Sequence, residues 1–284
     1  TPSSFGEANS DSPTIWQPID PSGLTFGTNG FYLDFEASGN LGNDVNGGTD
    51  LTEVSLDATN QSTDTPTNNY ATMNPLDNYY AGSTFSEGSL DVLHGSSAWT
   101  FNTSTIKVPT SGKWYAEFEV VTSQSNIVGI SREVSLGAGV PLEHASYSWA
   151  YRNNGNVYNN NGDLGGTYSA IDTAGQIIGV YIDQDNSKLY FGHNGTIQNS
   201  GTGISITADT EYFFAIGDNT DGASGKWSAN FGNPSSSFAI ASGNTDENDY
   251  GNFEFDPSDG GSSSFDSAAK DFYALNTKNL AEFG

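Results

Sequence analysis

Two glutamates in one stretch of the chain have the spacing of an acid/base pair. Glu117 and Glu119 stand two residues apart within residues 113–122, where they alternate with apolar residues. In a β-strand, residues i and i+2 point to the same side and lie about 6.5 Å apart, a separation that suits the two carboxylates of a glycosidase. The same alternation also describes two solvated carboxylates on the outer face of a strand, and we favour this second interpretation.

A second candidate is a cation site in residues 183–187. Asp183 and Asp185 alternate as oxygen-bearing side chains, as at the start of a calcium-binding loop. An EF-hand loop also requires Gly at its sixth position and Glu at its twelfth, and neither is present here. We therefore interpret the segment as a hairpin turn and predict no cofactor, with a structural calcium ion at these two aspartates as the alternative.

Other side chains that commonly carry chemistry are missing or isolated. The sequence has no Cys, which excludes a disulfide, a thiolate metal site and a cysteine nucleophile. Its three histidines, His94, His144 and His193, lie far apart with no ligand partner near them in the sequence. No Gly-x-Ser-x-Gly motif marks a serine nucleophile. We predict that the protein is not an enzyme.

The charge of the chain excludes several partners. Eight Lys plus Arg stand against 34 Asp plus Glu, a formal net charge of −26 for 284 residues. Such a protein repels phosphate backbones and anionic lipid surfaces. No apolar run reaches the roughly 18 residues that a membrane span requires. The sequence therefore predicts neither nucleic-acid binding nor membrane insertion.

A binding surface is the remaining candidate, and one Asn-rich region suits it. Aromatic side chains can stack on sugars or anchor a protein partner, and amides satisfy polar edges. We interpret Tyr147 and Trp149 as core residues. The predicted contacts are those that combine aromatic rings, amides and one guanidinium: Tyr151, Arg152, Asn153, Asn154, Tyr158, Asn159, Asn160 and Asn161.

Alternating apolar residues and turn formers predict an all-β fold. Residues 177–182 and 189–191 flank a polar turn and form the clearest hairpin, and residues 113–122 form a strand with Trp114, Phe118 and Val120 on its buried face. No apolar stripe of helical period extends over three turns, and only residues 266–270 and 277–283 suit short helices. The sequence predicts a two-sheet antiparallel β-sandwich. Its further strands are expected at 24–26, 31–36, 51–56, 79–85, 89–93, 98–108, 127–131, 146–151, 156–159, 211–217 and 225–232.

The ends of the chain read as extensions of this sandwich. Residues 1–23 are rich in Pro and small polar residues and form a predicted extended arm, in which Ile15 and Trp16 would pack on a neighbouring surface. Residues 24–232 are assigned to the sandwich, and residues 233–284 to a C-terminal arm with short turns. We expect both arms to contact neighbouring subunits.

From residue 112 to residue 232 the order of motifs resembles a SPRY (B30.2) domain, a concanavalin A-like sandwich of jelly-roll type. The matching pieces are Gly-Lys-Trp-Tyr-Ala-Glu-Phe-Glu-Val from residue 112, Val-Gly-Ile from 128, Tyr-Ser-Trp-Ala-Tyr from 147, Gly-Gln-Ile-Ile-Gly-Val-Tyr-Ile-Asp from 175 and Ala-Asn-Phe-Gly from 229. The resemblance implies a core domain at 112–232 that binds a partner through loops at one end. It also implies carboxylates on the strand of Glu117 without the longer acidic signature of concanavalin A-like glycosidases.

The flanks resemble phage virion proteins of marine and aquatic viruses. The similar segments are residues 27–35, the loop 64–69 and the closing residues 274–280. The resemblance implies a non-enzymatic tail-fibre, tail-associated or capsid-surface protein at the virion surface or outside the cell. Its expected partners are other virion proteins and further copies of the chain. A carbohydrate-recognising adhesin that binds host-surface glycan is the alternative, and a glycoside hydrolase is the third reading.

Overall fold

The chain forms two compact units. The computed structural model describes residues 1–10, 12–65, 67–77, 82–95, 99–135, 140–218, 224–257 and 271–284. The first unit is Thr1–Asn69 and the second is Tyr70–Gly284. The boundary therefore lies at residue 69, and residues 24–69, which the sequence analysis assigned to the sandwich, belong to the first unit.

The first unit contains little regular structure. The short strands β1 (Gly6–Ala8) and β2 (Trp16–Pro18) pair antiparallel, and two single 3₁₀ turns are present, η1 (Pro2–Ser4) and η2 (Ala58–Asn60). The strands predicted at 24–26, 31–36 and 51–56 are not formed. The predictions were wrong because alternation specifies only which faces a strand would have, whereas a strand also needs a paired neighbour, and these three segments have none among the described residues.

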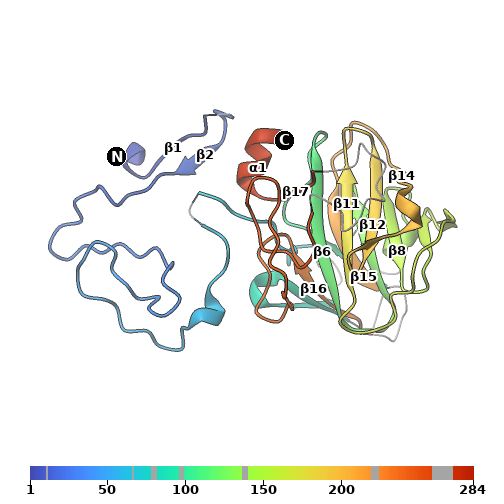
Figure 1. Ribbon diagram of the computed structural model, residues 1–284, viewed down its shortest axis with the longest axis horizontal. Coiled ribbons are helices and arrows are strands. Elements are labelled where there is room, and N and C mark those ends of the chain that lie inside the picture. Colours follow the sequence, from blue (N-terminus) through green and yellow to red (C-terminus); the bar gives the residue numbers. More distant parts are fainter. Residues whose placement is uncertain are drawn as a thin grey trace. The chain divides into compact units, whose positions relative to one another are not determined.

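Two sheets build the second unit (Figure 1). Over the described residues, the smaller sheet runs in the order β10 (Gly162–Asp163), β9 (Val157–Asn159), β8 (Ser148–Arg152), β7 (Asn126–Ser131), β15 (Phe213–Asp218) and β5 (Phe101–Thr103). The larger sheet runs in the order β13 (Thr196–Ile197), β12 (Lys188–His193), β11 (Ile177–Asp183), β6 (Lys113–Thr122), β16 (Lys226–Asn230), β4 (Asp91–His94) and β3 (Ser83–Ser86). Two further strands join it, β14 (Ile204–Ser205) on β12 and β17 (Tyr273–Ala274) on β6. The remaining elements are the turns η3 (Glu87–Ser89), η4 (Leu142–His144) and η5 (Asn199–Gly201) and the helix α1 (Thr277–Phe283).

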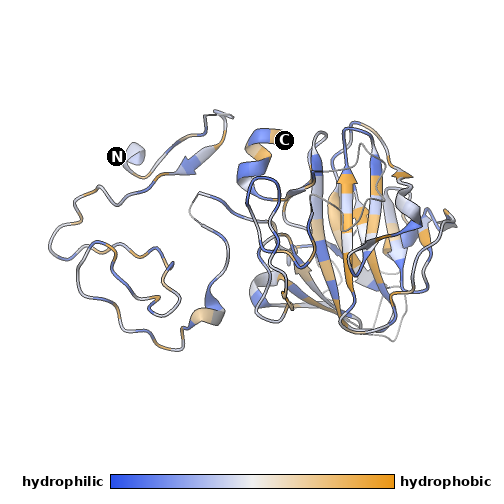
Figure 2. Ribbon diagram, in the orientation of Figure 1, coloured by the Kyte–Doolittle hydropathy of each residue, from blue (hydrophilic) through white to orange (hydrophobic). Residues whose placement is uncertain are grey.

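The inner faces of the two sheets meet in one hydrophobic core. Trp114, Phe118 and Val120 of β6 are fully buried, as the alternation of residues 113–122 predicted. Phe118 contacts Phe214 of β15 with ring centroids 6.2 Å apart, so the core joins the two layers directly. The most hydrophobic residues of the second unit follow its central strands (Figure 2). The predicted all-β, two-sheet sandwich is confirmed.

The outer face of the larger sheet is covered by the end of the chain. The ring of Tyr115 on β6 lies 4.4 Å from that of Tyr181 and 5.2 Å from that of Phe253 (centroid to centroid), and Phe272 packs on Tyr181 at 5.1 Å. β17 pairs with β6 at Trp114 and Tyr115, beyond the end of β16. The described part of residues 233–284 is therefore a layer of the sandwich unit, and the prediction of an extended C-terminal arm does not describe it.

The helix predicted near the C-terminus is present at the predicted residues. α1 spans Thr277–Phe283, and the side chain of Asn276 caps it by accepting the N–H of Asn279 at 2.9 Å. The helix predicted at 266–270 lies outside the described residues. Within the described residues, no helix is long and apolar enough to cross a membrane.

Replacement of Phe253 tests whether the C-terminal segment is part of the sandwich. The side chain of Phe253 is fully buried, so Phe253→Ala should lower the free energy of unfolding by about 3 to 5 kcal/mol in urea titrations. The matched control is Leu76→Ala, because Leu76 is 93% exposed. If Phe253→Ala is as neutral as the control, the segment does not cover the sheet.

Candidate functional site

A groove of about 450 Å³ lies where the edges of the two sheets approach each other. The smaller sheet contributes Asn159 of β9 and the segment 164–166 that follows β10. The larger sheet contributes β14, and η5 with the residues after it completes the opposite side. The groove is therefore built by loops that follow edge strands, which a rigid core holds in place.

Aromatic rings form the floor of the groove, and their faces are mostly covered. Trp149 is 7% exposed and packs edge-on against Tyr212 at 5.7 Å. Tyr168 is half-buried between Tyr151, 5.4 Å away, and Phe191, 6.4 Å away. Burial raises the pKa of Tyr168 to about 12, so its hydroxyl stays protonated at ordinary pH. The apolar side chain that the groove presents most openly is Leu164, which is 45% exposed.

Amide side chains fix the walls of the groove. Asn159 Nδ2 donates to the carbonyl oxygen of Ser148 at 2.7 Å, which holds β9 against β8. Asn199 Oδ1 accepts the N–H of Thr167 at 3.2 Å, and its Nδ2 donates to the carbonyl oxygen of Thr202 at 3.1 Å. Asn199 thus bridges the two segments that line the groove, and its loss would let them separate.

Glycine is required at two positions of the lining where the backbone passes close to an aromatic ring. A Cβ at Gly203 would lie 2.7 Å from the ring of Tyr190, and one at Gly166 would lie 2.6 Å from that of Tyr168. Gly166 also has a φ of +104°, which L side chains rarely adopt. Backbone rather than side chain therefore lines these parts of the groove.

Of the predicted contact residues, one lines the groove and another is buried in the core. Tyr151 is fully buried, and its hydroxyl donates to the carbonyl oxygen of Ser169. Tyr151 lies two residues after Trp149 on β8 and therefore shares its buried face, a consequence of strand alternation that the prediction overlooked. Of the predicted residues, all of which the structure describes, Asn159 lines the groove.

The other predicted contacts lie outside the lining of the groove. Arg152 lies over the ring of Tyr158 at 5.8 Å and within 4.0 Å of the Glu143 carboxylate. Asn160 and Asn161 form the exposed turn between β9 and β10, both with positive φ. Asn154 is exposed, and Asn153 is half-buried with its Nδ2 donating to the carbonyl oxygen of Gln124.

Glu117 is a buried structural group. Its carboxylate accepts the Tyr115 hydroxyl at 2.9 Å, Asn230 Nδ2 at 3.0 Å, and the backbone N–H groups of Glu254 at 3.0 Å and Phe255 at 2.8 Å. Burial raises the pKa of Glu117 to about 7, although these hydrogen bonds act to lower it. The expected solvated face is therefore wrong for Glu117, because the C-terminal segment covers it. A carboxylate with no exposed surface does not reach a polysaccharide.

The two aspartates of the predicted cation site make hydrogen bonds within the protein, and one of the three histidines is buried. Asp183 accepts the backbone N–H and the side-chain amide of Asn186 at 3.0 and 2.8 Å, and Asp185 accepts the N–H of Gly112 at 2.9 Å. These are the contacts of a hairpin turn. Among the described residues, no group of three or more His, Cys, Asp or Glu side chains is placed to hold a metal. His94 is fully buried, and burial lowers its pKa to about 4.

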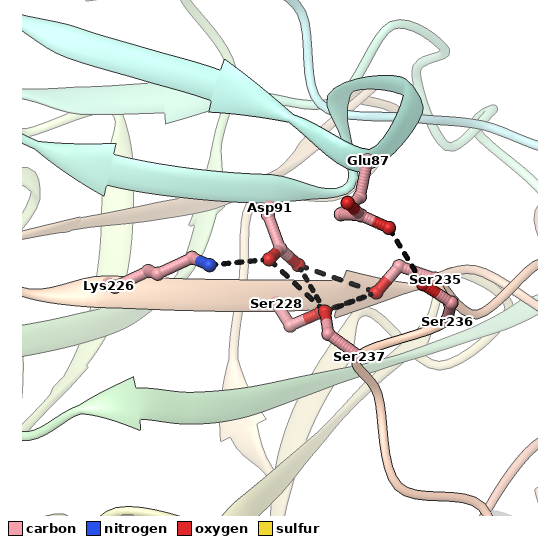
Figure 3. Close-up of polar contacts among 7 residues, drawn as sticks. All are labelled: Glu87, Asp91, Lys226, Ser228, Ser235, Ser236 and Ser237. Carbon is pink, nitrogen blue, oxygen red and sulfur yellow. Dashed lines mark hydrogen bonds and ion pairs between the residues drawn. The ribbon is translucent and has the colours of Figure 1, made fainter. Parts of the chain in front are cut away.

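A second polar cluster attaches the chain after β16 to β4 (Figure 3). The Asp91 carboxylate is 2.6 Å from Lys226 Nζ and accepts the hydroxyls of Ser235 at 3.4 Å and Ser237 at 3.2 Å. Ser236 donates to Glu87 at 2.9 Å. Lys226 is therefore the ion-pair partner of Asp91 within this cluster. We interpret the cluster as a second anchor of the C-terminal segment.

The predicted assembly residues lie in the first unit. Trp16 opens β2 and is 60% exposed, with its indole over Gly6 of β1. Ile15 is half-buried at the start of the same hairpin. The structure leaves an exposed aromatic ring where an assembly contact was predicted, and the contact itself stays a prediction.

Sequence reasoning missed most of the groove. Leu164, Tyr168 and Asn199 come from segments with no shared periodicity. The available signal was glycine, because Gly166 and Gly203 mark close approaches of the backbone to aromatic rings. The groove carries no charged catalytic pair in its lining, and its combination of an apolar centre, amides and backbone suits binding.

Comparison with known proteins finds a family match in the central part of the second unit. Residues 113–227 match the family model of the SPRY domain. Among solved structures, the chain is similar to the SPRY domain of human HERC1, with 22% identity, a TM-score of 0.42, and coverage of 52% of this chain and 91% of that one. It is also similar to stonustoxin, with 17% identity, a TM-score of 0.43, and coverage of 57% of this chain and 27% of that one. No curated protein sequence matches the chain.

The buried carboxylate of Glu117 should give stability a measurable pH dependence. Its pKa is raised from 4.5 to about 7, so the folded state binds its proton more tightly than the unfolded state. This group's contribution is therefore fully present below about pH 4.5 and falls by about 3 kcal/mol as pH rises through 7. Glu117→Gln should abolish this slope in urea titrations from pH 4 to 8.

The free energy of unfolding of wild type is subtracted from that of Glu117→Gln at each pH, because His94 gives both proteins a pH dependence of the opposite sign. Its lowered pKa makes stability rise with pH between about 4 and 6.5. The matched control is Glu247→Gln, since Glu247 is exposed, and it should leave the slope unchanged. Identical slopes in Glu117→Gln and wild type would contradict the assignment.

Proposed function

We propose that this chain, which carries a SPRY domain over residues 113–227, is a non-enzymatic binding module that holds a protein partner in the groove beside β9 and β14. The observation that carries the proposal is the groove itself, with an exposed Leu164 above aromatic rings and rims of amide and backbone groups. Apolar anchors surrounded by polar groups are typical of protein-binding sites. SPRY domains are generally binding modules for other proteins, which supports the same conclusion.

The covered aromatic rings favour a protein partner over a glycan. A sugar ring stacks on an open aromatic face. Trp149 is 7% exposed, and Tyr168 is packed between two other rings. The ring of Tyr158 is approached by Arg152. An extended peptide can instead use Leu164 as its apolar contact and the amides of Asn159 and Asn199 for its backbone.

The setting we propose is the surface of a phage virion. The similarity of residues 27–35, 64–69 and 274–280 to virion proteins supports this, and the partner would then be another virion protein or a second copy of the chain. A charge of −26 keeps such a surface protein away from the packaged nucleic acid. Mass spectrometry of gradient-purified particles tests the setting, and particles without the chain would contradict it.

A photo-crosslinker placed in the groove tests the binding role. With benzoyl-phenylalanine at Leu164, irradiation of particles that display the chain should join it to a protein through this position. The matched control is the same group at Leu93, whose exposure of 40% is close to the 45% of Leu164. Because Leu93 lies on β4, away from the groove lining, it should crosslink far less.

The outcomes separate the alternatives. A protein adduct from Leu164 and not from Leu93 supports the proposal. Equal yields at both positions, or no protein adduct at either, contradict it. A glycan-bearing adduct at Leu164 would replace the protein partner with a carbohydrate.

A further inference from the structure

The first unit, residues 1–69, does not bury a core of its own. Among its described residues, Leu41 is the one large apolar side chain that is buried. Eight of the eleven large apolar side chains that are exposed in the described chain belong to this unit: Phe5, Trp16, Phe31, Phe35, Val45, Leu51, Val54 and Leu56. Large exposed apolar patches on a protein mark interaction sites. We therefore interpret part of this surface as an interaction surface.

Part of this surface lines a hollow of about 880 Å³ within the unit. Its apolar floor comes from Leu33, Phe35, Leu41, Val45 and Leu56, together with the ring of Tyr32. Hydrogen bonds from side chains to backbone hold the surrounding segments together: Asp44 Oδ1 accepts the N–H of Tyr32 at 2.9 Å, and Gln61 Nε2 donates to the carbonyl oxygens of Phe35 and Glu36, each at 2.8 Å.

Phe35 is held in an unusual conformation at this hollow. Its φ is 59°, in the left-handed region that a bulky side chain rarely occupies, and its side chain is 53% exposed. Such conformations concentrate at binding sites, where the surroundings keep them. We therefore infer that Phe35 contacts the molecule that binds in the hollow.

Carboxylates surround the apolar floor. Asp20, Asp34, Glu36 and Asp64 line the hollow. Burial raises the pKa of Tyr32, which also lines the hollow, and Asp20, Asp34 and Glu36 raise it further. Residues 1–69 contain ten of the 34 acidic residues and no Lys, Arg or His. The hollow is therefore apolar at its centre and negative at its edge, with no cation of its own unit to neutralise it.

We propose that this hollow binds a segment of a partner protein in which apolar side chains alternate with lysine or arginine. The apolar side chains cover the floor, and the cations pair with the carboxylates at the edge. A second copy of this chain fits poorly, because it carries a formal charge of −26 and its own first unit is free of basic residues. The occupant differs from the partner of the groove, since the hollow lies wholly within residues 20–69.

Three synthetic peptides added to the full chain test the proposal. One alternates leucine with arginine, the second leucine with glutamate, and the third serine with arginine. Hydrogen exchange measured by mass spectrometry should show slower exchange in residues 20–69 with the first peptide alone. Because electrostatic pairing at an exposed edge is screened by salt, the affinity should fall in high salt.

Variants of the hollow separate this site from general attraction to an acidic protein. Asp34→Asn with Glu36→Gln should weaken binding of the leucine–arginine peptide by roughly tenfold, and Leu33→Ser with Phe35→Ser should do so at least as strongly. The matched controls lie in the sandwich unit: Asp209→Asn with Glu247→Gln removes two exposed charges, and Leu76→Ser removes an exposed apolar side chain. Both controls should bind as wild type does.

Several results would overturn the proposal. Equal binding of the serine–arginine peptide would show that charge alone acts. Equal weakening by the control pair would place the contact elsewhere. Protection of residues 20–69 without any peptide would show that the hollow is already covered, by a second copy if the protection depends on concentration and by the chain itself if it does not.

Discussion

The buried carboxylate of Glu117 is the interaction on which the arrangement of this protein depends. It lies on the central strand β6, whose other face supplies Trp114 and Phe118 to the core. By accepting N–H groups from Glu254 and Phe255, it joins that strand to a segment more than 130 residues further along the chain. A buried carboxylate is costly unless donors surround it, and here four donors do so. The outer face of the larger sheet is consequently interior.

This covering decides where the protein can bind other molecules. The rings of Tyr115 and Tyr181 would offer an apolar surface if the C-terminal segment were absent, but Phe253 and Phe272 of that segment cover them. The groove beside β9 and β14 stays open because it lies at sheet edges, where loops meet and Leu164 remains exposed. The first unit differs from the sandwich in its core and in its charge. It buries little apolar surface, and all of its charged side chains are acidic.

The parts of the fold that sequence predicted are those with strong local patterns. Strand β6 and helix α1 begin and end at the predicted residues, because alternation over ten residues is a local signal and a seven-residue helix depends on residues close together in the chain. The predicted role of Glu117 was wrong because alternation separates two faces of a strand without showing what covers each. The groove escaped prediction for a related reason: Leu164, Tyr168 and Asn199 come together through tertiary packing, and only the nearby glycines indicated a close approach.

Native-state hydrogen exchange at the amides of Glu254 and Phe255 tests the central claim most directly. If the Glu117 carboxylate holds this segment in the sandwich, both amides should exchange only through global unfolding, with the same free energy as the interior amides of β6. Exchange of these two amides through local opening, while β6 remains protected, would contradict the claim.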